Sequence, residues 1–122
     1  MRYGVTDILW GQVVKLRAGN RCERCGRAYP DGKNLQAAHI VTRARKLTRW
    51  KPTNGVALCG GDHMAFHRSP EKFFAWLESK RPGALGRLLI QSQLRRKPDE
   101  LADRVALRAE LKQLREGVRV NG

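Results

Sequence analysis

The chain has 122 residues, and 25 lysines and arginines against 11 aspartates and glutamates give it a net charge of +14. This length suits one compact domain with an appended segment and excludes two ordinary domains. Ordinary small domains carry net charges of magnitude about 2 to 8, so the excess favours a polyanionic partner, a nucleic acid, over a basic surface that only confers solubility.

The first predicted element is a short amphipathic helix over residues 7–18, where apolar residues recur at helical spacing. Thr6 or Asp7 is expected to cap its first turn, and Gly19-Asn20 is expected to end it. We interpret this helix as scaffolding that packs behind the cysteine site described next. Direct reading of DNA by the helix is the alternative.

Two of the three cysteines form a knuckle, Cys22-x-x-Cys25, with Gly26 at the tight turn. Three cysteines cannot all pair in disulfides, which favours metal ligation. Two thiolates at this spacing can bind one zinc ion, and Cys59 is placed in the chain where it can provide a further ligand to the same site. A redox pair or a buried pair is the alternative.

Two strand-like runs come next in the chain. The first is Leu35 to Val41 and contains His39; the second is Val56 to Leu58 and ends at Cys59 and a Gly60-Gly61 turn. The order of elements is therefore two strands followed by a helix.

That helix is predicted from Asp62 onward. His63 and His67 are four residues apart, so both imidazoles leave the same face of the helix, one turn apart. Two neutral imidazoles placed in this way can share a metal ion. His39 precedes His63 by 24 residues, enough for a hairpin to return and set His39 against the start of the helix.

The segment between the strands, Thr42 to Thr53, is strongly basic. We expect it to bind DNA phosphates, because a hairpin tip beside the histidines is where the charge of a nucleic-acid backbone must be neutralised. A solvated basic loop is the alternative. Trp50 is expected to pack the loop; stacking on a base is the alternative. The candidate DNA-binding residues are Arg43, Arg45, Lys46, Arg49 and Lys51.

The C-terminal part of the chain is predicted to be helical. Ser69-Pro70-Glu71 is a helix start, and a second helix follows over 84–97. A third, over 99–116, carries an apolar seam, which either folds back on the body of the protein or docks a partner. The seam consists of Leu107, Leu111, Leu114 and Val118.

His39, Asn54 and His63, in this order and spacing, with Cys22-x-x-Cys25 upstream and Leu58-Cys59 before the helix, resemble the HNH endonuclease family over about Cys22 to Pro70. The resemblance implies an α+β fold: a small ββα-metal core with a structural zinc knuckle, flanked by an N-terminal helix and C-terminal helices. We expect a nuclease domain at 1–80 and a basic helical extension at 81–122.

The resemblance implies a metal-dependent DNA endonuclease in which His39 is the general base. His63 and His67 would hold a catalytic Mg²⁺, Mn²⁺ or Ni²⁺ ion. Asn54 would pin the loop that presents His39; a turn residue chosen for local hydrogen bonds or positive φ is the compatible simpler interpretation. One motif makes one cut, so the protein would nick DNA as a monomer and cut both strands only as a weak dimer or by repeated encounters.

Zinc knuckles of this family usually end in a second Cys-x-x-Cys, and Asp62 replaces the fourth thiolate here. We expect Cys22, Cys25, Cys59 and Asp62 to hold structural zinc. His63 is the competitor for the fourth position. We assign it to the catalytic face, because otherwise His67 would stand there alone.

Similarity to small phage-type members implies a role in DNA packaging beside a large terminase, or in recombination, with duplex or branched DNA as partner. No run of about 18 apolar residues and no signal-peptide order occurs, so we expect no membrane association and a cytoplasmic location in a bacterium or phage-infected host. Ala38 stands where many members have a metal-binding aspartate or histidine. A zinc-stapled DNA-binding or recombination-accessory protein without cleavage is therefore the alternative.

Overall fold

The computed structural model describes residues 4–121, with side chains described up to residue 117. Within these residues the chain is α+β, with six α-helices, one 3-10 turn and one two-stranded antiparallel sheet. The elements in order are α1 (Val5–Arg17), β1 (Leu35–His39), α2 (Lys46–Arg49), η1 (Pro52–Asn54), β2 (Gly55–Cys59), α3 (Gly60–Arg68), α4 (Pro70–Lys80), α5 (Ala84–Ser92) and α6 (Glu100–Asn121).

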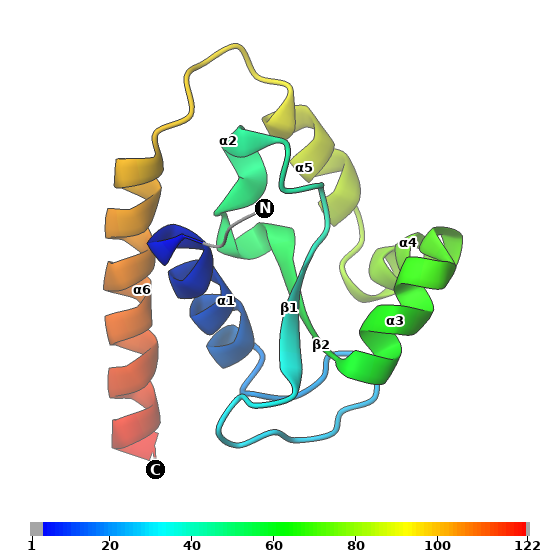
Figure 1. Ribbon diagram of the computed structural model, residues 1–122, viewed down its shortest axis with the longest axis vertical. Coiled ribbons are helices and arrows are strands. Elements are labelled where there is room, and N and C mark those ends of the chain that lie inside the picture. Colours follow the sequence, from blue (N-terminus) through cyan, green and yellow to red (C-terminus); the bar gives the residue numbers. More distant parts are fainter. Residues whose placement is uncertain (1–3, 122) are drawn as a thin grey trace.

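The β1–β2 hairpin occupies the centre of the molecule. Its register pairs Leu35 with Cys59 and His39 with Gly55. In Figure 1, α1 and α6 lie on one side of the hairpin, and α3, α4 and α5 lie on the other. Because helices cover β2 from both sides, its residues from Gly55 to Leu58 are all buried. β2 is thus a continuous apolar run, as expected for a strand without a solvent face.

The N-terminal helix forms with Gly4 as its N-cap residue, and of the two predicted capping residues Asp7 caps the first turn and Thr6 does not. α1 begins two residues earlier than expected, and the Asp7 carboxylate accepts a hydrogen bond of 2.9 Å from the Gly4 N–H. Thr6 is buried inside the helix, where its hydroxyl donates to Glu100. The end of the helix is as predicted, since Gly19 and Asn20 adopt φ values of 65° and 54°, in the left-handed region.

Gly55 allows α1 to approach the sheet closely. A Cβ atom at this position would lie 2.4 Å from Cγ2 of Val14 and 2.8 Å from Cζ2 of Trp10. Real Cβ atoms essentially never come this close to another heavy atom, so only glycine fits between the strand and the helix.

The basic segment between the strands is not an open loop. It contains α2 and η1, and Trp50 is 5% exposed beneath them, which confirms that this indole packs the segment. Asn54 ends η1 and is fully buried, with negative φ, so it is not a left-handed turn residue.

The two elements that follow β2 begin close to their predicted positions. α3 begins at Gly60, directly after β2, so the predicted Gly60-Gly61 turn is the first turn of the helix. α4 begins at Pro70 with Ser69 as its N-cap residue, as expected.

The seam of α6 folds back on the body of the protein. Leu107 and Leu111 are buried in the same core as Trp10 and Leu88, and Leu114 packs against that core. The side chain of Val118 lies outside the described residues. α6 runs beside α1 (Figure 1), and Arg17 pairs with Glu110 across the two helices at 3.1 Å. The boundary expected between a domain at 1–80 and a helical extension at 81–122 stays a prediction. Across residues 4–121, every helix is too short or too polar to cross a membrane.

Candidate functional site

The knuckle and the start of α3 bring four potential metal ligands together. The Sγ atoms of Cys22, Cys25 and Cys59 and a carboxylate oxygen of Asp62 all lie within 4.8 Å of one another. Asp62 Oδ2 is 3.2 Å from the sulfur of Cys22 and 3.3 Å from that of Cys59. Zinc accepts thiolate and carboxylate ligands in a tetrahedron, so this cluster could hold a metal ion such as zinc.

Backbone hydrogen bonds shape the knuckle. Gly26 adopts φ 80°, and its N–H donates to the Cys22 carbonyl at 2.9 Å, which turns the chain back so that both sulfurs face the same point. Glu23 ties this turn to β2, because its N–H donates to the Ala57 carbonyl and its carboxylate accepts from the Ala57 N–H. Arg81 binds the other carboxylate oxygen of Glu23 at 2.6 Å.

The electrostatics of the cluster suit a cation. Burial, with hydrogen bonds to Asp62 and Cys22, raises the pKa of the Cys59 thiol to about 11. Partial burial raises the pKa of Asp62, but hydrogen bonds from Cys22 and Arg24 outweigh it and the pKa is lowered. Arg24 holds Oδ1 of Asp62 at 2.6 Å, which leaves Oδ2 directed at the sulfurs. A bound ion would displace the thiol protons, as metal binding to cysteine generally does.

His63 is not part of this cluster. Its Nδ1 contacts Oε1 of Gln36 on β1, and its ring centroid is 4.8 Å from that of His67. An amide oxygen only accepts, so Nδ1 carries the proton and Nε2 keeps its lone pair. Burial lowers the pKa of His63, and His67 adds to this shift. Gln36 was not a predicted site residue, and only its place on a predicted strand two residues before Ala38 could have pointed to it.

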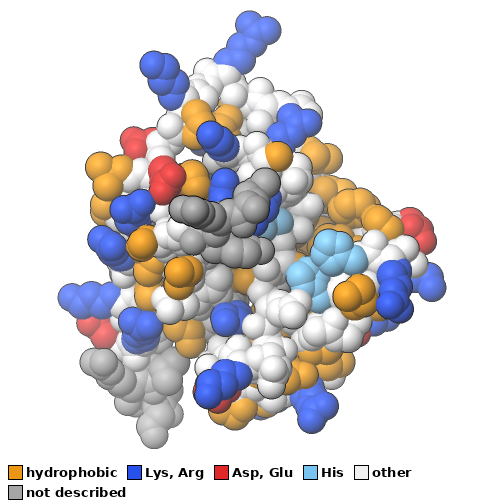
Figure 2. Space-filling view, in the orientation of Figure 1, with side chains coloured by type: hydrophobic (Ala, Val, Ile, Leu, Met, Phe, Trp, Pro, Cys, Tyr) orange, Lys and Arg blue, Asp and Glu red, His pale blue; other side chains and the backbone are white. Residues whose placement is uncertain are grey.

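A cavity of about 450 Å³ joins the three histidines. It lies between the β1 edge of the hairpin and helices α3 and α4, and Figure 2 shows the pale blue imidazoles beside hydrophobic side chains on this face. Its polar lining consists of His39, Thr42, Arg43, His63 and His67.

His39 lines this cavity and is held by a hydrogen bond and a ring contact. Its Nε2 lies 3.0 Å from the Arg49 carbonyl oxygen, so Nε2 donates and the neutral ring keeps a lone pair on Nδ1. The ring stacks on Trp10 with a centroid separation of 3.9 Å and an interplanar angle of 9°. Burial lowers the pKa of His39, and the charges of Arg43 and Arg49 act in the same direction. The imidazole is therefore neutral near pH 7.

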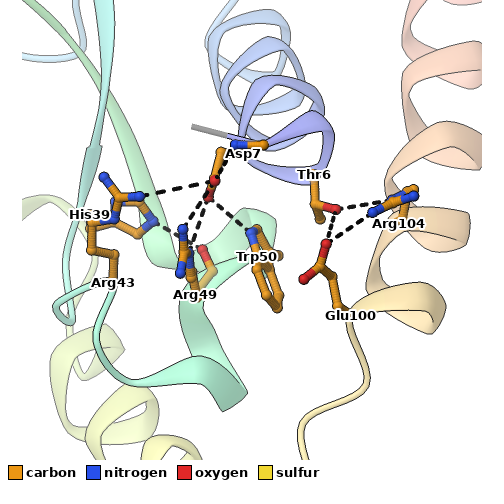
Figure 3. Close-up of polar contacts among 9 residues, drawn as sticks. Thr6, Asp7, His39, Arg43, Arg49, Trp50, Glu100 and Arg104 are labelled. Carbon is orange, nitrogen blue, oxygen red and sulfur yellow. Dashed lines mark hydrogen bonds and ion pairs between the residues drawn. The ribbon is translucent and has the colours of Figure 1, made fainter. Parts of the chain in front are cut away.

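Asp7 binds the segment that contains Arg49, whose carbonyl contacts His39 (Figure 3). Its carboxylate accepts two hydrogen bonds from the Arg49 guanidinium, at 3.1 and 3.0 Å, and one of 3.0 Å from the indole N–H of Trp50. Burial raises the pKa of Asp7, but these bonds, that from Gly4 and the Arg49 charge lower it overall. The sequence indicated Asp7 only as a helix cap and did not point to Trp10, because both interactions join residues far apart in the chain.

Asn54 binds the backbone two residues after His39. Its Oδ1 accepts from the Val41 N–H at 2.7 Å, and its Nδ2 donates to the Val41 carbonyl at 3.0 Å. The side chain therefore fixes the exit from β1, which is the geometry expected of a residue that pins the His39 loop.

The predicted DNA-binding residues have different surroundings. Arg45 and Lys46 are exposed at the surface. Arg43 lines the cavity and is 4.0 Å from Asp7. The Arg49 guanidinium is turned inward to Asp7, and Lys51 pairs with Asp103 at 2.8 Å. A phosphate would meet Arg45 and Lys46 without breaking an ion pair, whereas Arg49 and Lys51 would first have to release a carboxylate.

Comparisons of the chain with models of known protein families, with curated proteins and with solved structures give no match. The chain itself presents two candidate sites, a Cys₃Asp cluster and a histidine-lined cavity, and the first turn of α3 contributes Asp62 to one and His63 to the other.

Proposed function

We propose that the protein is a metal-dependent endonuclease of the HNH type that nicks DNA, with β1, β2 and α3 as its ββα-metal core. The observation that carries the proposal is the cavity in which Nδ1 of His39 is left as an acceptor, while His63, His67 and Arg43 line the same space. The resemblance of the motif in sequence adds the expected context, DNA packaging beside a phage large terminase, or recombination.

In this reaction His39 takes a proton from a water molecule through Nδ1. The water oxygen forms a bond to phosphorus as the opposite P–O bond of the backbone breaks, and the departing oxygen takes a proton from solvent. The carbonyl of Arg49 and the Trp10 ring keep the imidazole in the required tautomer and plane. Arg43 contributes positive charge at the cavity wall, where the phosphate must be neutralised.

His63 and His67 are the residues that would hold the catalytic ion. Two imidazoles would suit Ni²⁺ better than Mn²⁺ or Mg²⁺, since imidazole prefers the later transition metals. Such an ion supplies charge neutralisation at the phosphate and at the leaving oxygen. Gln36 contributes by accepting a hydrogen bond from Nδ1–H of His63, which leaves the lone pair of Nε2 open.

One observation favours a second function. Ala38 is 6% exposed and forms part of the cavity wall, so the position supplies no metal-binding side chain there. Without a ligand at this position the catalytic ion would be held weakly. The protein would then bind DNA through its basic surface without cutting it. The alternative is therefore a zinc-stapled DNA-binding or recombination-accessory protein.

Plasmid nicking tests the choice between these two functions. Wild-type protein is incubated with supercoiled DNA and added Mg²⁺, Mn²⁺ or Ni²⁺, beside the variant His39→Ala. The variant is expected to nick about 10² to 10⁴-fold more slowly, because a general base acts in the transition state, and to bind DNA with unchanged affinity. Equal nicking by both proteins would remove His39 from the mechanism. Binding without nicking by the wild type with every ion would favour the accessory function.

A further inference from the structure

The histidine cavity has a second wall that phosphate hydrolysis does not use. Beside the imidazoles it is lined by apolar side chains of α3 and α4, including three phenylalanines. Phe66 and Phe73 are 6% and 8% exposed and serve the core, but Phe74 is 40% exposed. Its ring centroid is 5.4 Å from that of Phe73, so the buried ring contacts the exposed one. We call Phe73 and Phe74 the aromatic wall.

This wall has no evident role in binding duplex DNA. An enzyme that touches only the backbone of a duplex needs cations and hydrogen-bond donors, because the bases are stacked on one another inside the helix. An unpaired nucleotide instead exposes the face of its base, and stacking on an aromatic side chain is a general means of holding it. The volume of about 450 Å³ lies in the range of small-molecule pockets and exceeds what a phosphate group needs.

We infer that the aromatic wall stacks an unpaired nucleobase next to the scissile phosphate, so that the substrate class is DNA with an unpaired nucleotide, such as a flap or a bulge. This inference rests on the proposed function. The base lies against Phe74, while its phosphate faces Arg43 and the imidazoles, which line the same cavity. All four bases have a stackable face, so the preference is for structure and not for sequence.

A matched pair of substrates tests this inference. Each is a fluorescent duplex with a one-nucleotide flap, which carries its base in one case and is abasic in the other, so that the phosphates are equal in number. Affinities are measured by anisotropy with no added divalent ion and no chelator, which leaves the cysteine cluster undisturbed. Wild-type protein is expected to prefer the base-containing flap by about 5- to 100-fold, at low and at high salt alike.

Three variants complete the test. Phe74→Ala is expected to abolish the preference without changing affinity for the abasic flap, and Phe74→Tyr is expected to restore it. Ile90→Ala is the matched control, because Ile90 is an exposed apolar residue, 67% accessible, outside the cavity lining. Melting temperatures establish that each variant is folded.

Equal affinity of the wild type for both flaps, or a preference retained in Phe74→Ala, would overturn the inference. The readout is independent of cleavage. A preference that persists in a protein that never nicks would reject the endonuclease and leave the cavity as a binding site for an unpaired base.

Discussion

At the scale of single residues, the histidines differ in what surrounds them. His39 is enclosed by Trp10 and by the carbonyl of Arg49, whereas the rings of His63 and His67 face each other on α3. The chemistry expected of each follows from this difference. A ring that donates through Nε2 and is stacked on an indole is suited to accept a proton at Nδ1, and a pair one helical turn apart is suited to share an ion.

We predict that His39 titrates below its ordinary pKa of about 6.5. Burial is the main cause, and the lower pKa means that the neutral, basic form persists into mildly acidic solution. The folded state then binds fewer protons than the unfolded chain in this window, so the contribution of His39 to stability is present above pH 6.5 and is lost as pH falls through the folded-state pKa. NMR titration of the ring protons measures the pKa of His39 in the folded protein. A value at or above 6.5 would contradict the buried position of the ring.

At the scale of elements, the first turn of α3 serves both sites. Asp62 points to the cysteines, while His63, one residue later, points to Gln36 and the cavity. Adjacent helical residues are about 100° apart around the axis, so one turn can face two directions. Closure of the cysteine cluster by an ion would therefore also fix the turn that presents His63.

The division of ligands gives an asymmetric prediction. Asp62→Ala is expected to loosen zinc and to lower the melting temperature, because it removes one of four ligands and leaves Arg24 without its carboxylate. His63→Ala is expected to retain zinc and to lose cleavage. Zinc content and thermal melting of the two purified variants measure this. Loss of zinc from His63→Ala with retention in Asp62→Ala would reverse the assignment.

The close packing of α1 on β2 gives a prediction about stability. Gly55→Ala is expected to lower the free energy of unfolding by about 1 to 3 kcal/mol, because the new methyl group would overlap Val14 and Trp10. Urea unfolding measures the change. Gly86→Ala in α5 is the control, since nothing lies within 4 Å of the added Cβ and a helical glycine replaced by alanine gains roughly 0.5 to 1 kcal/mol. Two variants shifting in the same direction would show that the close approach is not the cause.

At the scale of the whole molecule, the charge is distributed over the surface, and only part of it would be available to the DNA of the proposed function. Figure 2 shows lysine and arginine side chains around the face that carries the histidines. Several are already paired, including Arg49 with Asp7 and Lys51 with Asp103. The exposed cations of α2 and its N-cap, Arg45 and Lys46, remain the best candidates for binding the DNA backbone near the cavity.

We therefore predict that DNA affinity falls steeply as salt rises, and that Arg45 and Lys46 account for part of this dependence. The double variant Arg45→Ala, Lys46→Ala is expected to reduce the slope of log K against log salt by up to about 0.9 for each phosphate that the protein no longer neutralises. Arg108→Ala, Arg115→Ala, with the same charge change on exposed positions of α6, is the control. Equal reductions in slope for both variants would contradict the prediction that DNA binds preferentially at the surface formed by these two residues.

Much of the local structure was predictable from the chain. Helix and strand periodicity, the stop at Gly19-Asn20 and the start at Ser69-Pro70 depend on residues within a few positions of one another. The spacing of Cys22 and Cys25 and of His63 and His67 likewise sets local geometry, and Cys59 with Asp62 completed the cluster as expected.

Other features depend on interactions between distant segments. Trp10 beneath His39, Asp7 on Arg49 and Gln36 against His63 join residues from different elements, and no local pattern specifies such partners. The packing of α6 against α1 could not be predicted from the sequence either, because an apolar seam has the same sequence whether it packs inward or binds a partner. Periodicity states which face of an element avoids water, and packing against the rest of the chain decides what covers it.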